Sequence, residues 1–285
     1  MPAGDYQRVK ELGRGAFGVV YQVRHKDGAI YAMKEIKGST NASQIQELAA
    51  LHALKDHPNI VQYVEYFKEK RNMCIVMEFC NRGNLENYVI EAKLSDQVLL
   101  SFIKQMADAI QYSHSRRIVH RDLKPENVLI TMNNGQLIAK IADFGLAKIK
   151  LSGTVSLPSR GLPLASYMHT QAGTYLYLAP EVYNGNYTEK ADVFSLGIMF
   201  CAILERTIMG IRLVIYFSGQ CQEPVGIFLH TNPGATRTLD PKVNIPEESR
   251  NLINSMIRAS YKSRPSAKEV HEALQSASGS YCCIL

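Results

Sequence analysis

The stretch Ile118-Val-His-Arg-Asp-Leu-Lys-Pro-Glu-Asn-Val-Leu-Ile130 places several chemically active side chains in one short loop before a predicted strand. A carboxylate stands at Asp122, an ammonium at Lys124 and an amide at Asn127, and the apolar residues on both sides would fix the backbone. A carboxylate can accept a hydroxyl proton, an ammonium can offset charge on a transferring phosphoryl group, and an amide oxygen can bind a hard cation. These three residues are therefore candidates for a reactive site.

A second carboxylate follows in Ala139-Lys-Ile-Ala-Asp-Phe-Gly145. Asp143 comes directly after an apolar strand and before a turn that Gly145 permits. Hard cations prefer carboxylate oxygens, so Asp143 and Asn127 together could hold Mg²⁺ against the phosphates of a nucleotide. The tripeptide alone carries little information, but its place just after the Asp122 loop favours this interpretation.

Glycines are concentrated in Gly13-Arg-Gly-Ala-Phe-Gly18, between two predicted strands. They let a backbone approach a ligand closely and direct N–H groups at phosphate oxygens. In a dinucleotide-binding oxidoreductase such a loop would lead into a helix, whereas residues 19–23 have the pattern of a strand. A glycine turn with a purely structural role remains an alternative on these residues alone.

Lys34 stands on the otherwise apolar strand predicted over 30–36. Its neighbours Ala32 and Ile36 point to the same side, so its ammonium faces a half-buried surface and needs an anionic partner. Glu47, on the helix that follows, could supply one anion and a bound phosphate another. The alternatives are a lysine that extends to solvent from a strand edge and a solvated helix glutamate.

The apolar pattern divides the chain into two units. The first has strand-like runs and one helix, and the second is mostly helical, with a loop-rich stretch over 150–174. Strands are predicted over 18–23, 29–36, 61–67 and 73–79, and helices over 44–54, from about Ser95 to Tyr112, and over 192–204, 247–257 and 266–274, the last with Ser266 as its cap.

The composition is that of an ordinary globular protein, with 285 residues of which 46% are apolar and 20% charged. Disordered, collagen-like and coiled-coil classes are excluded. The net charge is +6, but the basic residues are scattered, so we expect no nucleic-acid partner. The six cysteines form no CxxC pair, which argues against a disulfide or zinc framework.

The termini bear on location. The first ten residues lack the apolar stretch of a secretory signal, and the most apolar run, 194–204, is shorter than the ~20 residues that cross a bilayer. We therefore expect a cytoplasmic, reduced protein. The end, Cys282-Cys-Ile-Leu285, fits a prenylation signal at Cys282, which by itself would give weak membrane association. The alternative is a frayed apolar C-terminus.

In combination, these motifs resemble the eukaryotic protein kinases from about Tyr6 to about Leu274. The run HRDLKPEN, the glycine loop, the strand lysine, the DFG tripeptide and Ala179-Pro-Glu181 follow one another in the family's order. The resemblance implies an α+β, two-lobed fold within residues 1–277. A small antiparallel sheet lobe with one helix would cover about 1–79 and a larger, mainly helical lobe about 80–277, with an activation segment over 143–181 and a flexible tail over 278–285.

The resemblance also implies ATP and Mg²⁺ as cofactors. Asp122 would be the catalytic base, Lys124 would assist it, Lys34 would contact the α- and β-phosphates and pair with Glu47, and the metal ligands would be Asn127 and Asp143. The residues expected to contact ATP are Leu12, Gly13, Gly15, Gly18, Val20, Ala32, Lys34, Met77 as gatekeeper, Glu78 and Cys80 of the hinge, and Leu129. Leu51, His120 and Phe144 would stack in an apolar spine.

Lys124 and Thr174 resemble the residues that the serine/threonine branch of the family carries at these places. We therefore expect protein substrates with Ser or Thr acceptors. In that branch the threonine hydrogen-bonds the catalytic aspartate and lysine. A structural pairing of Glu181 with Arg264 and a brace by Asp192 beneath the Asp122 loop are also implied. Phe194 replaces the family's frequent tryptophan.

Regulation is suggested by Arg121, which in the family binds a phosphate on the activation segment. Thr170, four residues before Thr174, is the candidate, phosphorylated by an upstream kinase or by the chain itself. An unmodified loop threonine is the alternative. A catalytically weak kinase-like scaffold that acts through protein interactions is the alternative to an active enzyme.

Overall fold

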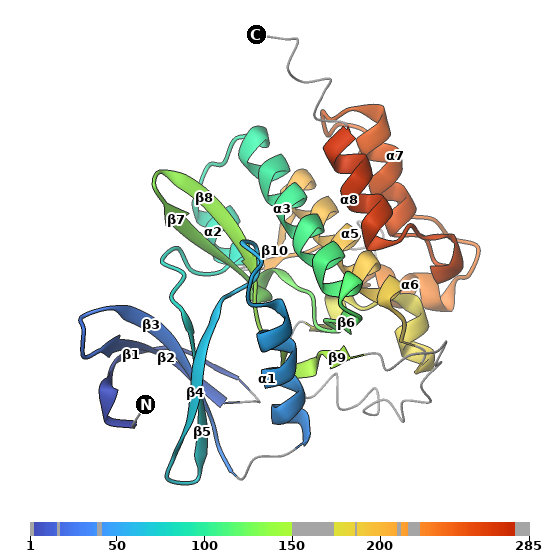
Figure 1. Ribbon diagram of the computed structural model, residues 1–285. Helices are drawn as coiled ribbons and strands as arrows, with labels where there is room; N and C mark the ends of the chain where they lie inside the picture. Colours follow the sequence, from blue (N-terminus) through green and yellow to red (C-terminus); the bar gives the residue numbers. More distant parts are fainter. Residues whose placement is uncertain are drawn as a thin grey trace.

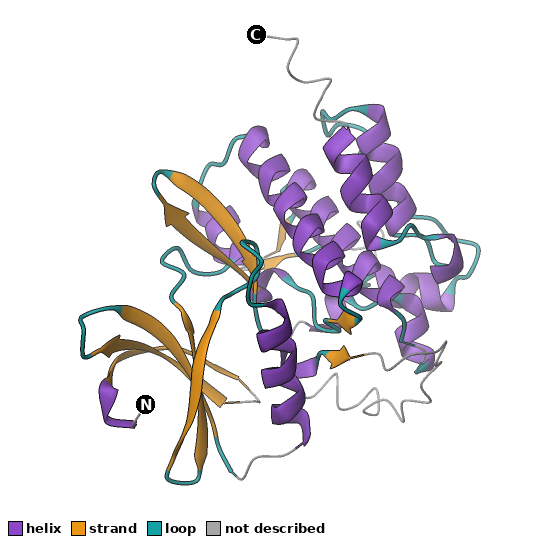
Figure 2. Ribbon diagram, in the orientation of Figure 1, coloured by secondary structure: helices purple, strands orange, loops and turns teal. Residues whose placement is uncertain are grey.

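The computed structural model describes residues 3–15, 18–38, 42–149, 174–185, 187–209, 212–215 and 223–276. They form two lobes, one built on a sheet and one built from helices (Figures 1 and 2). The predicted two-lobed α+β fold is thereby confirmed. Thr170 and Cys282 lie outside the described residues, as does the side chain of Thr174.

The smaller lobe is a five-stranded antiparallel sheet in the order β1-β2-β3-β5-β4. Its elements are β1 (Tyr6–Gly15), β2 (Gly18–His25), β3 (Ile30–Ile36), helix α1 (Ala42–Leu54), β4 (Tyr63–Glu69) and β5 (Asn72–Glu78). Burial alternates along β4, as expected of a strand with one covered face. Helix α1 packs Ala50, Leu51 and Leu54 into the core.

Gly18 begins β2 with φ at +146°, and a Cβ there would lie 2.2 Å from the backbone oxygen of Glu35 on β3. Only glycine allows the two strands to approach this closely. The glycine loop therefore leads into a strand, as the sequence indicated, and not into a helix.

The larger lobe is mainly helical. Its helices are α2 (Leu85–Glu91), α3 (Asp96–Ser115), α5 (Glu189–Glu205), α6 (Val225–Thr231), α7 (Glu247–Met256) and α8 (Ala267–Ser276). Its short strand pairs are β6 (Ile118–Val119) with β9 (Lys148–Ile149), β7 (Val128–Asn133) with β8 (Gln136–Ile141), and β10 (Ile208–Met209) with β11 (Arg212–Leu213). Short 3₁₀ turns span Ala3–Asp5, Pro125–Asn127, Phe144–Leu146, Thr174–Tyr177, Pro180–Asn184 and Tyr261–Ser263.

Helix α5 is the centre of this lobe, and every residue from 191 to 204 is buried. Gly197 makes this packing close, because a Cβ there would lie 2.8 Å from Ile257 and 2.9 Å from Met256. The helix begins at Glu189, three residues earlier than predicted, because the hydroxyl of Thr188 caps it by accepting the Lys190 N–H at 3.2 Å. The seven-residue helices α2 and α6 were not predicted, because two turns are too short to show a helical period.

The lobes are joined by backbone pairing as well as by the covalent link after β5. The Val61 N–H donates to the Ile141 carbonyl at 3.0 Å, and the Ile141 N–H donates to the Asn59 carbonyl at 2.8 Å. Since Ile141 ends β8, this pairing fixes the position of the residues that follow it, beginning with Asp143, between the lobes. Among the described helices, none combines the length and apolarity needed to cross a membrane.

Candidate active site

The loop between β6 and β7 arranges three polar side chains around Asp122. Asn127 donates its amide hydrogens to the Asp122 carbonyl at 2.8 Å and to Oδ2 at 3.0 Å, while the Lys124 ammonium lies 3.2 Å from the same Oδ2. The other carboxylate oxygen, Oδ1, is buried and accepts no hydrogen bond from the residues described. Burial raises the pKa of Asp122, although Lys124 opposes the rise. One acceptor oxygen of the carboxylate thus has no partner among the described residues.

Asp192, at the start of α5, holds this loop from below. Its carboxylate accepts the backbone N–H groups of His120 at 2.8 Å and Arg121 at 2.9 Å, together with the His114 ring at 2.9 Å. Burial alone would raise the pKa of Asp192, but His114, the nearby charge of His120 and the Arg121 N–H hold it below its usual value. The bracing position that the resemblance implied is the position observed. Arg121 has φ at +72°, and the two bonds to Asp192 fix this left-handed turn.

Lys34 connects the two lobes at the site. Its ammonium lies 2.6 Å from Glu47 Oε1 on α1 and 2.9 Å from Asp143 Oδ1 after β8. Burial alone would lower the pKa of Lys34, but the two carboxylates raise it above its usual value, so the ammonium stays charged. Burial raises the pKa of Glu47 against the opposing effect of Lys34. The pKa of Asp143 stays below its usual value, because Lys34 outweighs the effect of burial.

Asp143 and Asn127 fit the requirements of a hard cation. Asp143 Oδ1 accepts from Lys34 at 2.9 Å and from the Gly145 N–H at 3.3 Å. The amide nitrogen of Asn127 is engaged with Asp122, which turns its oxygen away from that residue. Within the same residues, no group of three or more His, Cys, Asp or Glu side chains could hold a metal by itself. Mg²⁺ is usually bound through one or two carboxylates plus substrate phosphates, which is the kind of ligand set that Asp143 and Asn127 offer.

The residues expected around adenine come from both lobes, three of them from neighbouring strands of the five-stranded sheet and one from the β7–β8 pair. Ala32 pairs with Met77 across β3 and β5, Val20 pairs with Lys34 across β2 and β3, and Leu129 lies on β7. Leu12, Gly13 and Gly15 lie on β1, and Gly15 pairs with Gly18.

The hinge residues do not all have the same groups available. The Glu78 N–H donates to the Gln62 carbonyl at 2.9 Å, and the Glu78 carboxylate pairs with Lys140 at 2.8 Å. The Glu78 N–H and side chain therefore already have partners within the protein, whereas the backbone N–H of Cys80 donates to no backbone carbonyl among the described residues. Burial raises the pKa of the Cys80 thiol to about 12, so the thiol stays protonated.

The expected spine residues are brought together. The rings of His120 and Phe144 have centroids 4.7 Å apart, and Leu51 and Phe144 belong to one buried core. The His120 Nε2–H donates to the Ala142 carbonyl at 2.9 Å, while its Nδ1 accepts the Asp122 N–H at 3.2 Å. One histidine therefore orients both the Asp122 loop and the chain just before Asp143.

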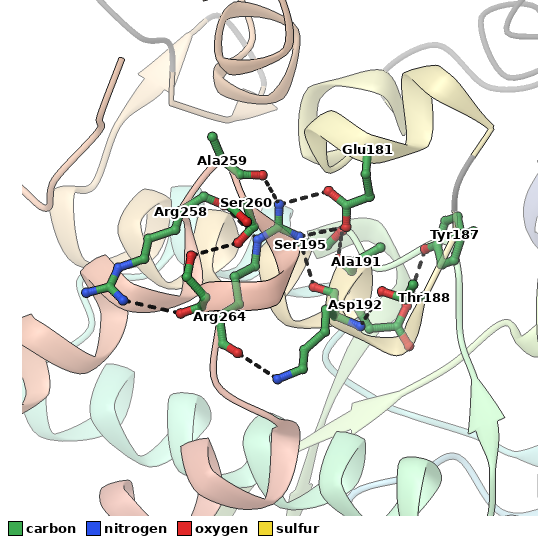
Figure 3. A network of polar contacts seen from close by, with 12 residues as sticks. Glu181, Tyr187, Thr188, Ala191, Asp192, Ser195, Arg258, Ala259, Ser260 and Arg264 are labelled. Carbon is green, nitrogen blue, oxygen red and sulfur yellow. Dashed lines mark hydrogen bonds and ion pairs between the residues drawn. The ribbon is translucent and has the colours of Figure 1, made fainter. Parts of the chain in front are cut away.

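Arg264 and Glu181 pair as expected, as Figure 3 shows. The Arg264 guanidinium also lies 4.7 Å above the ring of Phe194, so the aromatic residue fills the place of the usual tryptophan. Sequence reasoning did not find two further contacts near the loop, the Arg121 guanidinium above the Tyr187 ring at 4.7 Å and the ion pair of Arg212 with Glu126. No local pattern indicates either contact, because each joins segments far apart in the chain.

The sheet lobe with its glycine turn, the ion-paired lysine and the loop with Asp122 and Asn127 define a protein kinase domain. The chain belongs to this family, because the family model for the protein kinase domain matches residues 6–274.

Named relatives agree with this assignment. The chain is 34% identical over 204 residues to a probable serine/threonine-protein kinase zyg-1 of Caenorhabditis briggsae, which covers 71% of this chain and 27% of the relative. It is 35% identical over 212 residues to the serine/threonine-protein kinase ATG1c of Arabidopsis thaliana. The match covers 72% of this chain and 27% of that relative. It is 30% identical over 280 residues to a probable serine/threonine-protein kinase nek3 of Dictyostelium discoideum. The match covers 94% of this chain and 23% of that relative. The chain thus spans about a quarter of the length of these relatives.

Proposed function

We propose that the chain transfers the γ-phosphoryl group of ATP to serine or threonine hydroxyls of protein substrates, with Mg²⁺. The observation that carries the proposal is the double ion pair of Lys34, at 2.6 Å to Glu47 and 2.9 Å to Asp143, beside an Asp122 whose Oδ1 accepts no bond from the described residues. The names of the three relatives support the choice of Ser and Thr as acceptors.

The side chains divide the chemistry among them. Asp122 Oδ1 accepts the hydrogen of the substrate hydroxyl and aligns its oxygen for attack. Lys124, 3.2 Å from Asp122, is near enough to offset negative charge that develops on the transferred group. Lys34, fixed by Glu47, is positioned for the phosphates of the nucleotide, and Asp143 and Asn127 would hold Mg²⁺. When bound, ATP supplies the phosphoryl group and Mg²⁺ neutralises charge on its phosphates.

The alternatives receive less support. A kinase-like scaffold without catalysis typically lacks Lys34, Asp122 or Asp143, and this chain has all three. A nucleotide-binding oxidoreductase would need a helix after the glycine loop, where the chain has strand β2.

The experiment is phosphate transfer from Mg-ATP to a degenerate peptide library that offers Ser, Thr and Tyr acceptors. We expect product on Ser and Thr, lowered by ~10²–10⁴-fold in Asp122→Asn because a positioned proton acceptor is lost. Asp56→Asn, a matched change at an exposed site, should leave the rate unchanged. Equal turnover by Asp122→Asn and the unmodified chain would contradict the mechanism. Absence of transfer from a folded chain would favour the scaffold.

We further propose a cytoplasmic location, protein substrates, and regulation through phosphorylation of Thr170 by an upstream kinase or by the chain itself. Weak membrane association through a prenylated Cys282 stays a prediction from the sequence alone.

A further inference from the structure

The short β10–β11 hairpin is attached to three parts of the active-site region. The Arg212 guanidinium lies 2.5 Å from Glu126 Oε1 in the Asp122 loop. The backbone N–H of Leu213 donates to Glu86 Oε1 on α2 at 3.0 Å, and its carbonyl accepts the hydroxyl of Tyr177, in the 3₁₀ turn that precedes Ala179. Leu213 is fully buried. The hairpin is therefore held at a fixed place beside the catalytic loop.

Two carboxylates, Glu86 and Glu126, and two cations, Arg212 and Lys124, lie near one another at this place. Glu86 is buried, and burial and the neighbouring Glu126 both raise its pKa. Glu126 Oε2 is buried and accepts no hydrogen bond within the described part of the chain. A buried carboxylate is costly unless a cation or hydrogen-bond donors satisfy it. Arg212 gives Glu126 the only side-chain ion pair recorded for it among those residues.

Glu126 is within reach of a substrate that is bound at Asp122. Glu126 belongs to the same 3₁₀ turn as Asn127, whose amide contacts Asp122 at 2.8 Å and 3.0 Å. An extended peptide advances about 3.3 Å per residue, so side chains two or three positions from the acceptor lie roughly 7–10 Å from the reacting hydroxyl. A peptide with its acceptor at Asp122 would therefore bring such a side chain close to Glu126.

We propose that Arg212 is a specificity-determining residue, which occupies from within the chain the place at Glu126 where a basic side chain of a protein substrate would otherwise bind. The inference rests on the proposed kinase function. Because the carboxylate is already paired, the unmodified chain gains nothing from an arginine or lysine at that substrate position. Without the guanidinium, Glu126 and Glu86 attract a cation supplied by the substrate.

The first test is kinetic. A serine peptide in a neutral background carries a single arginine at each position from −4 to +4, and kcat and KM are measured for the unmodified chain and for Arg212→Met, which removes the charge but keeps most of the side-chain volume. We expect Arg212→Met to gain about tenfold in kcat/KM at one position, a difference of about 1.4 kcal/mol, through KM and not through kcat. The neutral peptide should be unaffected.

Control variants separate charge from structure. Arg212→Lys keeps the cation and should keep the original profile, and Arg206→Ala, which removes an exposed arginine paired with Asp96, should do the same. Adding Glu126→Gln to Arg212→Met should abolish the gain. An equal loss of kcat on all peptides in Arg212→Met would assign the residue a purely structural role and overturn the proposal.

The second test does not depend on turnover. In the Asp122→Asn background, binding of the favoured arginine peptide and of its neutral counterpart is measured by fluorescence anisotropy, and Arg212→Met should bind the arginine peptide about tenfold more tightly. Equal affinity would overturn the proposal even if the chain proved to be a scaffold. The proposal would also be overturned if the chain with Arg212 present bound the arginine peptide tenfold more tightly than the neutral peptide and lost this preference in Glu126→Gln. This comparison does not require any Arg212 variant to fold.

Discussion

Arg264 and Glu181 form two parallel hydrogen bonds of 2.8 Å between residues 83 positions apart, with both side chains buried. The pair joins the 3₁₀ turn Pro180–Asn184 to the segment between α7 and α8 (Figure 3). Arg264 donates further to the carbonyls of Arg258 at 2.7 Å and Ala259 at 2.9 Å, so its donors are engaged on several sides.

Removing one member of this pair should destabilise the fold. Glu181→Ala leaves the Arg264 charge buried without its partner, and we expect a loss of about 3–5 kcal/mol in the free energy of unfolding, measured by urea titration. Asp96→Ala, which breaks the exposed pair with Arg206, should cost less than about 1 kcal/mol. Similar losses in the two variants would show that the buried pair contributes no more than a surface pair.

The activity should depend on pH through Asp122. Burial raises the pKa of this carboxyl above its usual value, and the protonated form cannot accept the substrate hydrogen. The rate should therefore fall as the pH falls through a pKa above that of an ordinary aspartate. Lys124→Met removes the charge that opposes the rise, so the acid limb of kcat/KM should move to higher pH. A limb that stayed in place would mean that another group controls it.

Lys34→Met should make stability depend on pH in a defined direction. With the ammonium present, Asp143 has a lowered pKa; without it, burial raises the pKa of both Asp143 and Glu47. A carboxyl whose pKa is higher in the folded than in the unfolded state binds more protons when folded, so stability rises as the pH falls. The variant should therefore be more destabilised at pH 7.5 than at pH 5.5, by urea titration.

The matched control is the double variant Lys34→Met, Glu47→Gln, which removes one of the two orphaned carboxylates. Its loss of stability at pH 7.5 should be smaller than that of Lys34→Met. If the single variant lost the same free energy at both pH values, burial of the two carboxylates would not be the cause.

Thr170 is expected to carry a phosphate that orders the activation segment. Thr170→Ala should lower kcat and make the remaining activity insensitive to phosphatase, while the unmodified chain loses activity on the same treatment. The measurement is initial rate before and after phosphatase. Unchanged activity and unchanged phosphatase sensitivity would leave Thr170 without this role.

Much of the site was predictable because local sequence carries its chemistry. The spacing of Asp122, Lys124 and Asn127 within one loop is fixed by the chain itself, and the structure brings the side chains of Lys124 and Asn127 within 3.2 Å of the Asp122 carboxylate. The helix predicted over 44–54 is α1, which begins two residues earlier, at Ala42. Its side chains of Leu51 and Leu54 are buried as the helical spacing indicated, whereas Ile45 is exposed. The sequence alone thus determined the two-lobed fold, the family and the residue types of the site.

The pairings across the fold were decided only by tertiary structure. Whether Lys34 meets Glu47 and Asp143 depends on how α1 lies against the turn after β8, and no local pattern specifies that distance. Arg212 reaches Glu126 across 86 residues, from a hairpin whose two-residue strands carry no periodic signal. Local propensity acts over a few residues, whereas these contacts arise only when packing brings distant segments together, because their charges can be buried only as pairs.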